Sequence, residues 1–194
     1  MSNTETPIST GQARLTFRKT GTDTDGELLE MEARYPPNSS QPPYHFHPYQ
    51  GERFEVLQGE FRTKIDGVEH IYRAGEEFSV PVNTPHWMHN ISDEEGRLLW
   101  QVRPAMKTQA FLETMWGLGT DEETNTNGLP NILQLAVILR EYSDEFRASS
   151  PPYPIQRILF AILAPIGRLL GYRARYARYS GDAKATGLQI PAQR

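Results

Sequence analysis

The sequence has no cysteine among its 194 residues. This absence excludes a disulfide scaffold, a thiolate zinc site, an iron–sulfur cluster and a cysteine nucleophile. A basic and apolar leader is also missing, because the N-terminal residues MSNTETPISTGQARL are polar. We therefore expect no secretory signal and a cytoplasmic location.

An excess of positive charge is missing as well, since the net charge is −4. An acidic chain argues against nucleic-acid binding, and we expect no nucleic-acid partner. The charge is uneven, because residues 1–150 carry a net −10 and residues 151–194 a net +6. A basic C-terminal segment on an acidic body indicates either docking of that segment on the body or contact with an anionic surface.

Short runs of alternating apolar residues, separated by Gly, Pro, Asn and Asp, fill the first half of the chain. Many short strands with turn residues between them are typical of an antiparallel sandwich or barrel. Asp66-Gly67 predicts a two-residue hairpin turn, because a type I′ turn needs a positive φ at both positions. The expected strands cover residues 14–19, 27–35, 53–57, 60–65, 70–73, 77–80, 87–91 and 97–102.

The hydrophobic period changes after Pro104, and helices are expected over residues 106–118, 130–146 and 155–171. The middle helix follows from apolar residues spaced close to 3.6 apart, which end at Phe146. The sequence thus predicts three parts: a flexible leader over residues 1–11, a β-barrel over residues 12–104, and a helical extension with a basic tail over residues 105–194.

The stretch of residues 155–171 is almost wholly apolar. Its longest charge-free run, residues 158–167 between Arg157 and Arg168, is too short for a membrane span, which needs about 20 residues. So wide an apolar arc must be covered, either by the barrel or another helix, by a second copy of the chain, or by a membrane surface. We expect no membrane contact and a homodimer, and we expect Pro165 to kink or split the helix.

Four side chains are candidates for one metal site. His45 and His47 are two residues apart, so in an extended strand they share one face. The loop of residues 48–51 can reverse the chain and bring Glu52 back beside them. His86, on a later strand, can face the same interior, whereas His89 then points outward. Imidazole nitrogens with one carboxylate suit a divalent transition metal.

These residues carry a family resemblance. His45, His47, Glu52 and Gly59 match the first motif of the cupin superfamily at every spacing, and the second motif is matched by Gly75, Pro81, His86 and Asn90. Asn83 replaces a turn glycine, and Asn tolerates left-handed backbone better than most residues. Ser39 replaces another glycine. The resemblance covers roughly residues 27–103 and implies a mainly β fold, a double-stranded β-helix (jelly-roll barrel). The change of period after Pro104 adds the C-terminal α-helices to this expected fold.

The resemblance also implies the chemistry. His45, His47, Glu52 and His86 would bind one divalent transition metal ion (Fe, Mn, Ni, Zn, Co or Cu), while His70 and His89 match no ligand position. The ligand set resembles that of cupin dioxygenases, in which the metal acts as Lewis acid and template. Glu52 is the candidate catalytic residue, as ligand or general base.

A small molecule is the expected partner. Strand alternation places a mostly apolar pocket at Phe54, Val56, Met88 and Asn90. A metal-dependent dioxygenase acting on an enolisable or aromatic compound is the first hypothesis, and an isomerase, decarboxylase or cyclase is the second. A non-catalytic binding module is the third, because the fold alone does not determine function.

Overall fold

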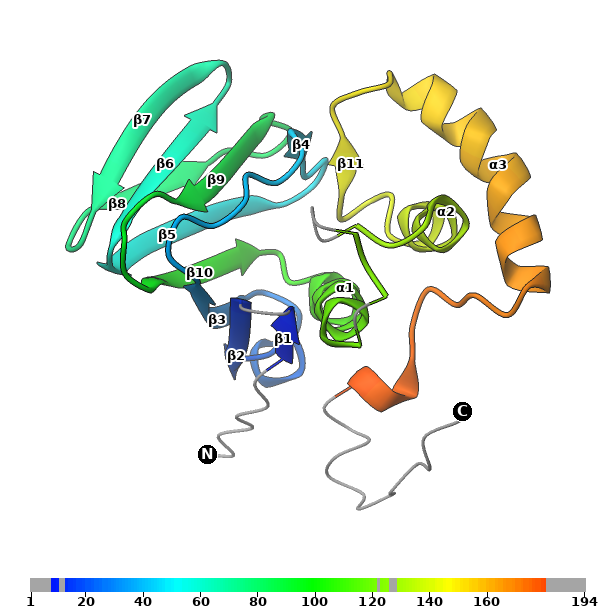
Figure 1. Ribbon diagram of the computed structural model, residues 1–194, viewed down its shortest axis with the longest axis horizontal. Helices are drawn as coiled ribbons and strands as arrows, with labels where there is room; N and C mark the ends of the chain where they lie inside the picture. Colours follow the sequence, from blue (N-terminus) through cyan, green and yellow to red (C-terminus); the bar gives the residue numbers. More distant parts are fainter. Residues whose placement is uncertain (1–7, 11–12, 122, 126–128, 181–194) are drawn as a thin grey trace.

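The computed structural model describes residues 8–10, 13–121, 123–125 and 129–180. Most of the expected leader and the end of the basic tail, residues 181–194, lie outside these residues. Within the leader, Ile8–Thr10 forms a short strand, β1, which pairs with Ala13–Lys19, β2. Figure 1 shows a β-barrel beside a layer of helices.

Two antiparallel sheets face each other in the barrel. The first has the order β1-β2-β3-β10-β5-β8 and the second β11-β4-β9-β6-β7. From β3 to β11 the chain passes back and forth between the two sheets, except at the β6–β7 hairpin, which is the winding of a jelly roll, so the expected fold class is confirmed. The remaining strands are β3 (Leu29–Tyr35), β4 (His45–Phe46), β5 (Gly51–Gln58), β6 (Glu60–Ile65), β7 (Val68–Arg73), β8 (Glu77–Val80), β9 (His86–Asn90), β10 (Gly96–Arg103) and β11 (Arg147–Ala148).

Strand alternation fills the barrel as the sequence predicts. In β5, Glu52, Phe54 and Val56 are buried, while Arg53 between them is exposed. The φ angles of Asp66 and Gly67 are 48° and 83°, which confirms the expected type I′ turn between β6 and β7. The core is aromatic and aliphatic, with Phe54, Phe61, Leu15, Leu29, Met31 and Leu98 among its fully buried side chains.

Three helices follow the barrel: α1 (Thr108–Thr120), α2 (Ile132–Glu141) and α3 (Tyr153–Leu169). Helix α2 begins at the cap residue Asn131, whose side chain accepts from the backbone N–H groups of Leu133 and Gln134. It ends at Glu141, so the expected extension to Phe146 is wrong. The chain leaves the helix there because Phe146 and β11 pack against the barrel instead.

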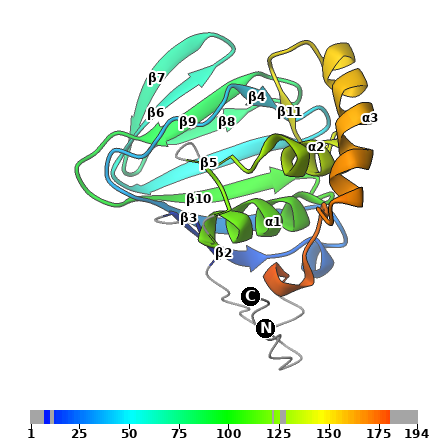
Figure 2. The same ribbon diagram turned by 45° about the vertical axis from the view of Figure 1, so that its right-hand side comes forward.

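Helix α3 is one continuous, gently curved element on the outside of the molecule (Figure 2). Pro165 lies within it, so the helix is not split. The helix ends at Leu169, and Gly171 just beyond it has a φ of 92°, which lets Tyr172 N–H donate to the carbonyl of Gly167. Among the residues described, no helix combines the length and the hydropathy needed to cross a bilayer.

The fully buried residues of α3 are small or polar, and Phe160 packs beside them against the core. Gln156, Ala164 and Gly167 are its buried residues, and the helix packs on α2. A Cβ atom on Gly167 would lie 2.8 Å from the carbonyl oxygen of Leu133 and 2.8 Å from a methyl group of Val137. The two helices therefore approach so closely that glycine is required at this point.

Gly167→Ala tests this contact. At an exposed helical site the change stabilises a protein by about 1 kcal/mol. Here we expect a net loss of about 1–2 kcal/mol, because the added methyl group must displace the backbone of α2. Urea denaturation measures the change, and a gain in the free energy of unfolding would contradict the close packing of α2 and α3.

Candidate metal centre

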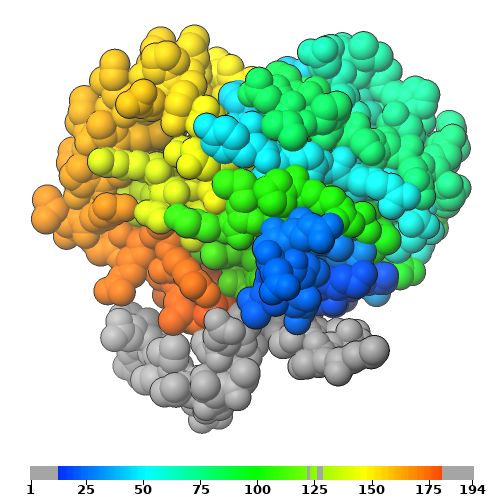
Figure 3. Space-filling view, turned by 180° about the vertical axis from the view of Figure 1, so that it is seen from behind, coloured from blue at the N-terminus to red at the C-terminus, as the bar shows by residue number. Residues whose placement is uncertain are grey.

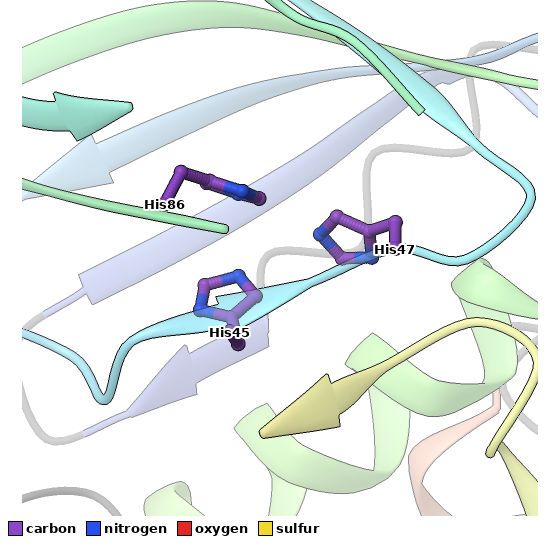
Figure 4. A group of neighbouring side chains, drawn as sticks. All are labelled: His45, His47 and His86. Carbon is purple, nitrogen blue, oxygen red and sulfur yellow. The ribbon is translucent and has the colours of Figure 1, made fainter. Parts of the chain in front are cut away.

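Three histidine rings converge at one end of the barrel. His45 lies on β4 directly opposite His86 on β9, and His47 follows on the same side of the chain. Their ring nitrogens lie within 4.8 Å of one another, and Figure 4 shows the three rings turned toward a common point. His47 and His86 are buried, and His45 is half-buried. The structure therefore brings the predicted histidines together.

The backbone fixes the orientation of each ring. The Nδ1 atoms of His45, His47 and His86 lie 2.8, 2.5 and 2.9 Å from the carbonyl oxygens of Pro43, Glu145 and Thr84, respectively. A carbonyl only accepts, so each Nδ1 carries the proton and donates it. The Nε2 atoms are then left with a free lone pair in the neutral rings. This arrangement is the usual one for histidines that bind metals.

Glu52 joins this cluster from β5. Its Oε2 lies 3.3 Å from Nε2 of His47 and 2.9 Å from Nε2 of His86. The other oxygen, Oε1, accepts a hydrogen bond of 3.0 Å from the indole of Trp100 on β10. One oxygen is thus fixed by the barrel wall, and the other faces the histidines.

The charges in the cluster are strongly coupled. Burial, together with the neighbouring rings of His86 and His47, lowers the pKa of His45 to about 3, so His45 is neutral. Burial raises the pKa of Glu52, but the close approach of the His47 and His86 imidazoles outweighs it and holds that pKa at about 2. Burial likewise lowers the pKa of His86, and Glu52 reverses this effect and raises it.

The donor atoms fit a metal ion. Nε2 of His47 and Oε2 of Glu52 are buried, and neither has a well-formed hydrogen bond. A buried polar atom without a partner costs about 1–3 kcal/mol, so two of them side by side need a ligand for compensation. A divalent cation would satisfy the free lone pairs of the histidines and the negative charge of Glu52 together.

The C-terminal extension completes the site, which the sequence did not reveal. The carbonyl of Glu145 orients His47, and the ring of Phe146 stacks on His45 with centroids 4.6 Å apart. Next to them, β11 pairs with β4 and continues the second sheet. No metal motif includes these positions, and Phe146 looked like the last apolar position of a helix.

Trp100 is the other site residue that the sequence analysis did not single out. Its strand was expected, and its burial follows the alternation of Leu98, Trp100 and Val102. The indole donor could have been inferred from the need of a buried carboxylate for a partner.

The four residues expected to line a pocket lie on two strands, β5 and β9. Phe54 and Val56 are buried on the same face of β5 as Glu52, and the Phe54 ring stacks between Phe78 and Trp100. Met88 is half-buried on β9. Asn90 donates to the carbonyls of Pro36 and Glu94, and it accepts from Ser92. That side chain therefore holds two loops together, and a ligand pocket at these four residues stays a prediction.

The other motif positions are also placed. Asn83 adopts a φ of 61°, the left-handed backbone expected for the residue in place of a turn glycine. His70 is exposed on β7 and stays outside the cluster, whereas His89 is half-buried and its Nδ1 bonds the carbonyl of Ser39. The described histidine cluster thus contains His45, His47 and His86 alone.

Two known proteins are similar to this chain in sequence. An oxidoreductase of Arthrobotrys oligospora is 28% identical over 162 residues, which cover 75% of this chain and 62% of that protein. The polyketide synthase CurC of Streptomyces cyaneus is 32% identical over 60 residues, which cover 31% of this chain and 39% of that protein. The alignments thus leave more than a third of each relative unmatched.

Solved structures are similar at lower identity. A predicted oxalate decarboxylase of Thermotoga maritima has a TM-score of 0.47 and 18% identity, over 51% of this chain and 90% of that chain. An RmlC-like cupin of Shewanella frigidimarina has a TM-score of 0.44 and 22% identity, over 51% and 82% of the two chains. The family model of the cupin domain matches residues 31–102. The segment that carries His45, His47, Glu52 and His86 is therefore a cupin domain.

Proposed function

We propose that this protein is a dioxygenase that depends on one divalent transition metal ion, bound through His45, His47, His86 and Glu52. The observation that carries the proposal is the shared orientation of the three rings, whose Nδ1 atoms are all bound to backbone carbonyls. When bound, the metal supplies Lewis-acid and redox chemistry. The ion is one of Fe, Mn, Ni, Zn, Co or Cu.

The substrate proposed is a small enolisable or aromatic compound. Phe146 forms an aromatic wall over His45, and the buried rings of Phe54, Phe78 and Trp100 stack next to Glu52. Such walls favour flat, apolar molecules over sugars or phosphates. The names of the two relatives support this direction, since one is an oxidoreductase and the other a polyketide synthase.

Glu52 is the proposed catalytic residue. Its Oε1 is held by Trp100, so the carboxylate keeps one orientation, and Oε2 faces the histidine cluster. From that position Oε2 can hold the metal or take the proton that an enol or phenol loses on binding. Molecular oxygen is the second substrate of the proposed reaction.

Removal of one imidazole tests the metal site. We expect His47→Ala to abolish binding, because the ring is oriented by Glu145 and has no substitute. Glu52→Gln should keep weaker binding, since an amide oxygen still coordinates. Elemental analysis of protein purified without chelators measures both, and His70→Ala, an exposed histidine on β7, is the matched control. Wild-type protein that takes up no iron, manganese, nickel or zinc would reject the site.

Trp100→Phe tests the orientation of Glu52. The change keeps an aromatic ring between Phe54 and the barrel wall but removes the indole donor. Loss of such an outer partner lowers metal affinity about 10- to 100-fold, and we expect the lower end of that range. Competition with a chelator of known affinity measures the change, and unaltered affinity would show that Trp100 only fills space.

Oxygen consumption separates the candidate reactions. We expect iron-loaded protein to consume oxygen with an enolisable or catecholic compound, and His47→Ala to abolish that turnover. An oxygen electrode and product analysis measure it. Turnover under argon would favour an isomerase, decarboxylase or cyclase instead. Binding without any turnover would reduce the protein to a non-catalytic binding module.

A further inference from the structure

Helix α3 exposes most of its large aliphatic side chains, whereas an ordinary surface helix buries them. Its fully buried residues are Gln156, Ala164 and Gly167, and Phe160 packs beside them against the core, whereas most of its large aliphatic side chains point into solvent. Ile158 is 65% exposed and Leu169 is 88% exposed. The outer face of α3 is formed by Ile155, Ile158, Ile162, Ile166, Leu169 and Leu170. Soluble proteins seldom expose so many large aliphatic side chains on one helix, so this face has a partner.

The charge around the helix indicates the chemistry of that partner. Residues 146–180 contain six arginines and no acidic residue, although residues 1–150 carry a net −10. Arg157 and Arg168 lie on one stripe of α3, roughly 140° around the helix from the centre of the outer face, and both are exposed. Arg168 approaches Glu141 to 3.7 Å, a surface pair that leaves the arginine accessible. An apolar face on a helix that also carries exposed arginines suits a partner surface that is both apolar and anionic.

A second copy of the chain fits this charge poorly. In a two-fold interface with α3 at the axis, the α3 helices of both protomers would lie side by side, and Arg157 and Arg168 of each would approach those of the other with no acidic residue on either helix between them. The homodimer expected from the sequence therefore has an electrostatic cost on this face.

We propose that α3 docks this protein on an anionic lipid surface, lying flat with its outer face among the acyl chains. The helix has 17 residues and a strong segregation of apolar and basic side chains, as interfacial helices have. Half-buried Tyr153 and Tyr172 stand at its two ends, and tyrosine is enriched at the headgroup level. Each arginine near such a surface adds to the attraction. Figure 3 shows that α3, in orange, lies along one edge of the molecule, beside α2.

Vesicle sedimentation with the full chain tests the proposal. Vesicles of phosphatidylcholine alone are compared with vesicles of equal parts phosphatidylcholine and phosphatidylglycerol. We expect partitioning onto the anionic vesicles to be at least about tenfold stronger, and to weaken at high salt. Equal partitioning onto both kinds of vesicle, or onto neither, would overturn the proposal.

Two variants and a control locate the contact. Ile162→Glu should lower partitioning at least about tenfold, because a carboxylate would enter the acyl region. Combined Arg157→Gln and Arg168→Gln should lower it about tenfold on anionic vesicles only. Val68→Glu changes an equally exposed aliphatic residue on the far hairpin, and its partitioning should equal that of the wild type.

Light scattering after gel filtration tests the competing occupant. Without lipid, we expect a monomer. A dimer that Ile162→Glu dissociates would show that a second copy covers the face, and it would overturn lipid docking. Metal content, measured in parallel on every variant, keeps this result separate from the proposed function, since none of these residues contacts the histidine cluster.

Discussion

The structure depends on one constraint, which is that three imidazoles and a carboxylate share a small region of the barrel end. Each buried polar atom there needs a partner. The Nδ1 atoms of the three imidazoles are hydrogen-bonded to the backbone carbonyls of Pro43, Thr84 and Glu145. Oε1 of Glu52 accepts from the indole N–H of Trp100. The inner half of each group, which faces the centre, is left for a ligand. The same hydrogen bonds therefore orient each imidazole and the carboxylate and leave their inner atoms facing the centre of the cluster.

This constraint explains why the extension belongs to the site. The carbonyl that orients His47 comes from Glu145, far along the chain, and the next residue covers His45. The backbone of β4 is only two residues long, and β11 gives it a second neighbour opposite β9. An incomplete barrel end would leave the first two ligands on a frayed strand. The helical layer thus contributes to the precision of the metal centre as well as to its cover.

Much of this arrangement could be predicted from the sequence, because it depends on local periods. Alternation placed Glu52, Phe54 and Val56 on one face, and the spacing of the two motifs brought His45, His47 and His86 together. What could not be predicted depends on contacts between distant residues. Trp100, Glu145 and Phe146 act on the site through tertiary contacts, and no period marks such a role. The end of α2 was misplaced for the same reason, since Phe146 has a helical spacing but a better partner in His45.

For helix α3, the sequence shows the apolar pattern but does not show which side of the helix is buried. Its apolar arc was evident in the sequence, but an arc does not say which part of it faces the protein. Steric fit decides this, since Gly167 lies close against the carbonyl of Leu133 in α2 and Ala164, on the same face, is fully buried. The large side chains must then face outward. Because β11 and Phe146 directly precede the helix, the surface that α3 occupies and the barrel end that holds the histidines are joined by only a few residues. A lipid surface under α3 would therefore fix the orientation of the barrel end relative to that surface, which would suit an enzyme whose substrate is apolar and flat.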